Sequence, residues 1–140
     1  MPQKPPFSPT VALLTIGRVW DAALADALKP LGLTTRKYGL LGHIRATPGV
    51  SFSELARRSR ITVQSAHTAV AAFAADGLVE DATARAGAAS RLQVTAAGER
   101  LLGEAAERVA VLDAQFAAEY PVLVEAMRRQ IEEHLSSRSR

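Results

Sequence analysis

The fold is decided by the stretch SFSELARRSRITVQSAHTAVAAFAADG, which occupies residues 51–77. Ser51 and Glu54 are three residues apart, the spacing of a capping box, so we predict a helix that starts here and ends near Ser59. After a two-residue break, Thr62 can cap a further helix. Its small and apolar residues recur every three or four positions and are therefore expected to face one core: Ala66, Val70, Phe73 and Gly77. The two helices together are typical of a helix-turn-helix.

The opposite face of the second helix is free of this core and carries polar side chains. Glutamine can pair with adenine through two hydrogen bonds, and short hydroxyl side chains can bond to bases or phosphates. If the helix lies in a major groove, the residues that contact base edges are Gln64, Ser65, His67 and Thr68. The alternative interpretation is a polar helix face that meets only water.

Basic side chains gather around this motif. Residues 1–33, 34–95 and 96–140 carry formal charges of +1, +4 and −2, which sum to the +3 of the chain. The excess in the middle segment favours a polyanionic partner, although each cation alone also suits a solvated surface. The expected phosphate and minor-groove contacts are Arg36, Lys37, Arg57, Arg58, Arg60, Arg85 and Arg91.

The flanking sequence predicts further helices and one hairpin. Residues 78–95 are short, alternate in polarity and surround an Ala-Gly loop, which indicates two strands and a wing. Helical apolar repeats lie before the motif and again on both sides of Pro121. The fold class is therefore mostly α with a small β-hairpin wing, in one domain. Its parts are an extended arm at 1–9, a dimerisation helix at 10–32, a winged helix-turn-helix core at 33–95 and C-terminal dimerisation helices at 96–140.

The outer helices carry more apolar surface than so small a core can cover. We therefore expect a homodimer with two-fold symmetry, the alternative being a helical layer packed within one chain. A dimer would place two recognition helices about 34–36 Å apart, one turn of DNA, and so match a pseudo-palindromic site.

Composition excludes several classes of function. The absence of cysteine excludes disulfides, thiolate metal sites and thiol redox sensing. No long apolar run or signal-like start is present, so we expect a cytoplasmic protein without a membrane partner. The histidines His43, His67 and His134 fall on three predicted helices, and no catalytic set or glycine-rich phosphate loop is found. We expect no enzyme activity, no cofactor and no metal site.

The order of these elements resembles that of the MarR family of bacterial transcription regulators, over nearly the whole chain. The resemblance rests also on three motifs: Leu55-Ala56, Asp76-Gly77-Leu78-Val79 and Val94-Thr95-Ala96-Ala97-Gly98. It implies a homodimeric repressor that binds duplex DNA and is relieved by a small anionic aromatic effector. The effector would bind between the dimerisation helices and the core, where the candidate residues are Arg18, Trp20, Tyr38 and His43. For Trp20 and His43, packing in the core is the alternative.

The wing departs from the family pattern. MarR-like wings usually carry an Asp-Arg pair at the tip, where this chain has Ala86 and Gly87, and Asp81 replaces a usual arginine. Two functions therefore remain open. The first is a sequence-specific, ligand-responsive DNA-binding transcription regulator, and the second is a protein-interaction module on the same fold with eroded DNA binding.

Overall fold

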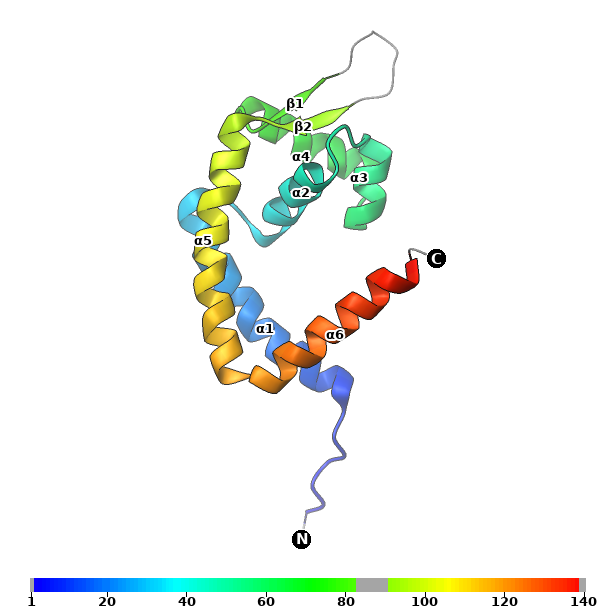
Figure 1. The fold of residues 1–140 in the computed structure, drawn as a ribbon, viewed down its shortest axis with the longest axis vertical. Coiled ribbons are helices and arrows are strands. Elements are labelled where there is room, and N and C mark those ends of the chain that lie inside the picture. The colour runs from blue at the N-terminus through cyan, green and yellow to red at the C-terminus, as the bar shows by residue number, and fades with distance from the viewer. Residues whose placement is uncertain (1, 83–90, 139–140) are drawn as a thin grey trace.

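The computed structural model describes residues 2–82 and 91–138 (Figure 1). This part of the chain is mostly helical and carries one antiparallel hairpin, which confirms the predicted fold class. The elements in chain order are α1 (Pro9–Leu28), the 3₁₀ helix η1 (Lys29–Leu31), α2 (Thr35–Ala46), α3 (Phe52–Ser59), α4 (Val63–Ala75), β1 (Val79–Asp81), β2 (Leu92–Val94), α5 (Ala96–Glu119) and α6 (Pro121–Arg138).

The helices begin where local chemistry sets their start. At the first five α-helices a serine or threonine hydroxyl accepts a hydrogen bond from the backbone N–H three residues later, at 3.0–3.3 Å. Such a cap satisfies an amide that has no partner inside the helix. The capping residues are Ser8, Thr34, Ser51, Thr62 and Thr95. The caps predicted at Ser51 and Thr62 are thus confirmed.

The main core lies beneath the hairpin, where α2, α3 and α4 pack against one another and against the start of α5 (Figure 1). Its side chains come from all of these elements and from β2, and the largest of them are completely buried. We call this unit, α2 to β2, the winged core. Its largest fully buried residues are Leu41, Ile44, Leu55 and Leu92, with Leu102 of α5 closing it.

The predicted core face of α4 is right for three of its four residues. Ala66, Val70 and Phe73 are buried. Gly77 is exposed and lies beyond the helix, with φ of +71°, so its assignment to the core face was wrong. Its role is to end the helix, because a glycine adopts this left-handed conformation without steric cost.

The hairpin is joined to the core at its base. Val79 pairs with Val94, and Leu92 forms an isolated bridge with Val50 in the loop before α3. Leu92 donates to the carbonyl of Val50 at 3.0 Å and accepts from the N–H of Gly49 at 2.8 Å. The base of the hairpin is therefore positioned by the same loop that leads into the helix-turn-helix.

The start of α5 is fixed against the exit of α4. The hydroxyl of Thr95 donates to the carbonyl of Gly77 at 2.5 Å, and its N–H donates to the carbonyl of Leu78 at 3.0 Å. A Cβ placed on Gly98 would lie only 2.3 Å from the Leu78 carbonyl oxygen and 2.5 Å from a Val94 methyl group. This close approach requires glycine at position 98.

The outer helices form a second, thinner layer. α1 runs beside α5, and α6 turns back from the far end of α5 (Figure 1). A small cluster of Leu28, Leu33 and Ala105 joins this layer to the winged core, whereas no residue of α6 is buried. We call α1, α6 and the second half of α5 the helical arms. Within residues 2–82 and 91–138, no helix has the length and apolar character needed to cross a bilayer.

Candidate nucleic-acid interface

The turn between α3 and α4 sets the position of the candidate recognition helix. Arg60 adopts φ of +54° after the last turn of α3, and Ile61 donates to the carbonyl of Ala56 at 3.0 Å. Thr62 then caps α4. The core side of α4 is buried and its other side is exposed to solvent. The helix itself lies next to the hairpin (Figure 1).

The four predicted base-contacting residues differ in their exposure to solvent and in their hydrogen bonds within the chain. Gln64, His67 and Thr68 are exposed, while Ser65 is half-buried. Ser65 accepts a hydrogen bond from the hydroxyl of Thr62 at 2.9 Å, and Thr68 donates to the carbonyl of Gln64 at 3.1 Å. No hydrogen bond joins the Gln64 amide to another part of the described chain. Gln64 therefore keeps the fullest capacity to pair with a base.

An aromatic contact orients His67. Its imidazole stacks on the ring of Phe52, with 3.8 Å between ring centroids and 21° between planes. Phe52 is the first residue of α3, so the stack ties the recognition helix to the helix before it. Sequence reasoning missed Phe52, although an aromatic residue just after a helix cap was a signal that could have been used.

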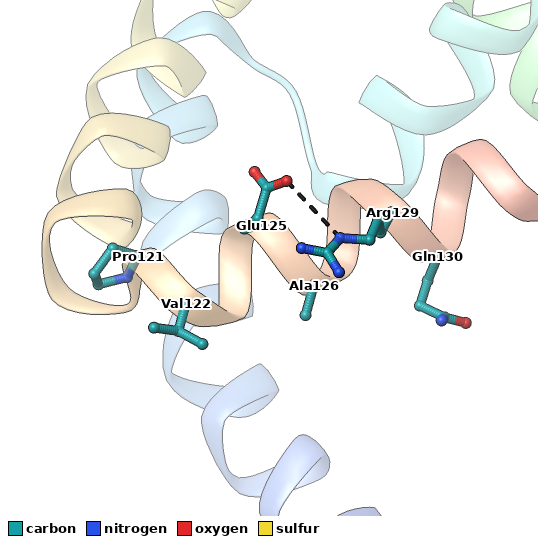
Figure 2. Close-up of a pocket in the computed structure, with 6 residues that line it drawn as sticks. All are labelled: Pro121, Val122, Glu125, Ala126, Arg129 and Gln130. Carbon is teal, nitrogen blue, oxygen red and sulfur yellow. Dashed lines mark ion pairs between the residues drawn. The ribbon is translucent and has the colours of Figure 1, made fainter.

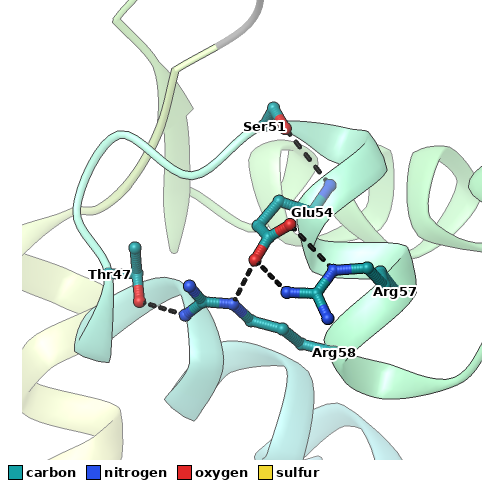
Figure 3. A network of polar contacts seen from close by, with 5 residues as sticks. All are labelled: Thr47, Ser51, Glu54, Arg57 and Arg58. Carbon is teal, nitrogen blue, oxygen red and sulfur yellow. Dashed lines mark hydrogen bonds and ion pairs between the residues drawn. The ribbon is translucent and has the colours of Figure 1, made fainter. Parts of the chain in front are cut away.

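A polar network fixes two of the predicted phosphate-binding arginines (Figure 3). Arg57 donates to Glu54 through Nε at 3.0 Å and through Nη2 at 2.5 Å, and Arg58 Nε donates to the same carboxylate at 2.8 Å. Arg58 also donates to the hydroxyl of Thr47 at 2.5 Å. Hydrogen bonds from Arg57 and then Arg58 lower the pKa of Glu54 from 4.5 to about 2.

This network corrects the predicted capping box. Ser51 caps the Glu54 N–H as expected, but the Glu54 carboxylate turns to the two arginines instead of back to the Ser51 N–H. Ionised arginines are stronger partners for a carboxylate than a neutral amide is. Arg57 and Arg58 are therefore positioned by Glu54, which also offsets part of their charge.

The other predicted cations lie on α2, in the turn before α4 and in the wing. Arg36 and Lys37 are exposed on the first turn of α2, and Arg60 is exposed in the turn before α4. Arg91 is exposed at the base of the wing, where its backbone N–H donates to the carboxylate of Asp81 at 3.0 Å. The three remaining wing residues of the sequence analysis, Arg85, Ala86 and Gly87, lie outside the described residues.

Of the four predicted effector-binding residues, Trp20 and His43 line different cavities in the described part of the chain. Trp20 packs edge-on against Phe116, with 5.0 Å between ring centroids, and lines an apolar cavity of about 240 Å³ between α1, α5 and α6. Tyr38 is half-buried between the two core clusters, and Arg18 is exposed on α1. His43 lines a different cavity, between α2 and α3.

The fold and the exposed α4 define a winged helix-turn-helix protein, and known proteins agree. A model of the MarR family matches residues 31–98. The HTH-type transcriptional repressor Rv2887 of Mycobacterium tuberculosis is 32% identical over 107 residues, which cover 76% of this chain and 77% of the repressor. This chain belongs to the MarR family.

Solved structures show the same architecture. The crystal structure of Rv2887 in complex with DNA has a TM-score of 0.74 and 26% identity, covering 93% of this chain and 98% of that one. Rv2887 in complex with salicylic acid has a TM-score of 0.71 and 27% identity, covering 93% and 97% of the two chains. MepR of Staphylococcus aureus, at 15% identity and a TM-score of 0.74 over 94% and 98% of the chains, shares the fold.

Proposed function

We propose that this protein is a sequence-specific DNA-binding transcription regulator of the MarR family, acting as a repressor. The observation that carries the proposal is α4: its core face is buried, its start is capped by Thr62, and its outer face presents Gln64 and His67. Membership in a family with repressor relatives, one of them solved with DNA, supports the same function. Catalysis forms no part of the proposal.

In this proposal α4 enters the major groove and the cations around it hold the backbone. Gln64 pairs with a base edge, and the stack on Phe52 holds His67 in one orientation for a second contact. Arg57 is 65% exposed and can turn toward a phosphate, whereas Arg58 is shared between Glu54 and Thr47. Phosphate contacts give affinity and base contacts give sequence preference.

The helical arms support a two-fold homodimer. Large apolar side chains on α1, α5 and α6 remain exposed in the single chain, and an open apolar groove runs between α5 and α6. Figure 2 shows one face of α6, where Val122 and Ala126 are flanked by a Glu125–Arg129 ion pair at 4.0 Å. Covering such surfaces with a second copy would pair two winged cores for a pseudo-palindromic site. The exposed residues include Leu13, Leu14, Val19, Val111, Val122, Met127, Ile131 and Leu135.

A small anionic aromatic effector is the proposed ligand, supported by the complex of Rv2887 with salicylic acid. An effector that binds one spacing of the two winged cores better than the other would shift the dimer toward it and change DNA affinity reciprocally. The cavity beside Trp20 lies between the helical arms, so a ligand bound there would contact the helices whose arrangement such a shift would change. Because the protein would act on DNA, we propose a cytoplasmic location.

The first experiment is selection of duplexes from a random pool, followed by titration of the selected duplex at two salt concentrations. The Gln64→Ala, Thr68→Ala variant should relax the base preference. A matched control is Gln115→Ala, Thr15→Ala, which changes the same residue types on exposed faces of the arms, Thr15 being bonded to the carbonyl four residues earlier as Thr68 is.

A pseudo-palindrome that only the α4 variant loses, with affinity that falls as salt rises, would support the regulator. Weak binding that neither variant changes would instead favour the alternative, a protein-interaction module on this fold.

A further inference from the structure

The side chains on the outer face of α4 form a row whose chemistry selects among base pairs. A helix turns by about 100° per residue, so the positions farthest from its buried residues lie together along one line. Thr68 lies nearly opposite the buried Ala66 and Val70, while His67 lies about 100° to one side of Thr68. We call this line the outward row; its members, all exposed, are Gln64, Thr68, Ala71, Ala72 and Ala75.

The hydroxyl of Thr68 has only acceptor capacity left. It donates its hydrogen to the backbone carbonyl of Gln64 at 3.1 Å, and a carbonyl oxygen cannot donate in return, so the direction of this bond is fixed. Thr68 can therefore accept a hydrogen bond from DNA but has none to give to a phosphate oxygen or to an acceptor on a base. In the major groove the donors are the amino groups of adenine and cytosine.

The residue types that most often read G·C pairs are absent from α4. Guanine is contacted chiefly by arginine or lysine, and the cytosine amino group by aspartate or glutamate. None of these four residue types occurs between Val63 and Ala75. Gln64, one turn before Thr68 in the outward row, is instead the residue type that pairs with adenine through two hydrogen bonds. The polar part of the outward row therefore suits adenine.

The remainder of the outward row presents methyl groups. Ala71, Ala72 and Ala75 are exposed and carry nothing beyond Cβ. The 5-methyl group of thymine lies in the major groove, and alanine and threonine methyl groups pack against it. The apolar part of the outward row therefore suits thymine, the partner of adenine.

We propose, on the basis of the regulator function above, that α4 reads A·T pairs and that Thr68 is a specificity-determining residue, which accepts a hydrogen bond from an adenine amino group. Gln64 and Thr68 are one helical turn, about 5.4 Å, apart, and base pairs are spaced about 3.4 Å along the duplex. The two side chains would thus meet neighbouring base pairs. Ala71 and Ala72 would pack against thymine methyl groups in the same half-site.

The test uses base analogues that each remove one group from the major groove. A duplex is first selected from a random pool with the full chain, and its A·T pairs are then changed one at a time. Deoxynebularine in place of deoxyadenosine removes the amino group, and we expect one position in each half-site where this weakens binding about three- to tenfold, the effect of one hydrogen bond. Deoxyuridine in place of thymidine removes the methyl group and should weaken binding about threefold where an alanine covers it.

Substitutions at Thr68 assign the amino-group effect to its oxygen. Thr68→Val keeps the shape but removes the hydroxyl, so it should bind the adenine and nebularine duplexes equally well at that position. Thr68→Ser keeps the oxygen and should retain the difference. Thr15→Val is the matched control, because the exposed Thr15 also donates to the carbonyl four residues earlier, at 2.8 Å, but lies on α1. It should behave as the wild type does.

The possible failures of this inference and of the regulator function can be told apart. A selected site with G·C at the positions whose preference Thr68→Val changes would overturn the inference and leave the regulator intact. So would an amino-group effect of equal size in wild type and Thr68→Val, or deoxyuridine substitutions that change binding nowhere in the half-site. A chain that selects no sequence at all would overturn the regulator function and this inference with it.

Discussion

Large apolar side chains are buried in the winged core of this chain but exposed on its helical arms. In the winged core Leu41, Ile44 and Leu55 have no exposed surface, whereas on the arms Leu13 is 69% exposed and Val122 is 82% exposed. Both regions follow the same helical periodicity in the sequence. An apolar stripe in a sequence therefore specifies a helix face that must be covered, but not whether the same chain or a partner covers it.

The largest expected effect is in the winged core. Leu55→Ala should lower the free energy of unfolding by about 2–5 kcal/mol, because the removed atoms leave a cavity among completely buried neighbours. Ile131→Ala on α6, where the side chain is 62% exposed, should cost far less in the dissociated chain. Urea unfolding of both variants at low protein concentration measures these changes. Equal losses of unfolding free energy would contradict the predicted difference between the two regions.

The second-largest change in stability is expected at the junction between the winged core and the helical arms. Gly98→Ala should destabilise the protein by about 1–3 kcal/mol, because a Cβ would overlap the Leu78 carbonyl oxygen. On the same helix, the Cβ added by Gly103→Ala meets open space, so this variant should stabilise the protein by about 0.5–1 kcal/mol. Thermal unfolding of this matched pair measures both, and the prediction fails if the two variants shift in the same direction.

A third prediction concerns what covers the arms. Ile131→Glu should weaken the proposed homodimer at least tenfold, about 1.4 kcal/mol, because a charge would enter the apolar surface that is proposed to form the contact. Sedimentation equilibrium gives the dissociation constant. Gln115→Glu on α5, at an already polar exposed position, is the control. An unchanged dissociation constant in Ile131→Glu would place the dimer contact elsewhere.

The smallest effect is expected at Glu54, on the surface of the winged core. Its pKa is lowered in the folded state, so its contribution to stability is present above pH 4.5 and is lost as the pH falls toward about 2. Glu54→Gln should therefore flatten the decline in stability over this range. Urea unfolding between pH 7 and pH 2.5 tests it, with Glu125→Gln, in a 4.0 Å and highly exposed pair, as the control. Identical pH profiles for wild type and Glu54→Gln would contradict it.

Local signals predicted much of this structure because they act within a few residues. Thr62 and Ser51 cap their helices as the sequence indicated, and the hairpin forms where polarity alternates. Gly77 was misassigned because a small residue at helical spacing was taken for a core position, whereas positive φ decided its role. At the candidate interface the four polar positions of α4 remain a prediction from the sequence, and their hydrogen bonds and the Phe52 stack were not predicted.

The helix starts, the apolar face of α4 and the absence of thiol chemistry could be read from the sequence alone. The MarR family was indicated there by a resemblance in motifs and element order, which the known relatives confirm. The helix starts, the apolar face and the lack of thiols follow from capping, periodicity and composition, which are properties of the residues and their sequence neighbours. Three features became visible in the three-dimensional structure: Glu54 binds Arg57 and Arg58, Trp20 and His43 line separate cavities, and the Ser59 hydroxyl has no hydrogen-bond partner among the described residues. Such contacts depend on how side chains from different elements pack in space, and they cannot be predicted from the spacing of residues along one helix.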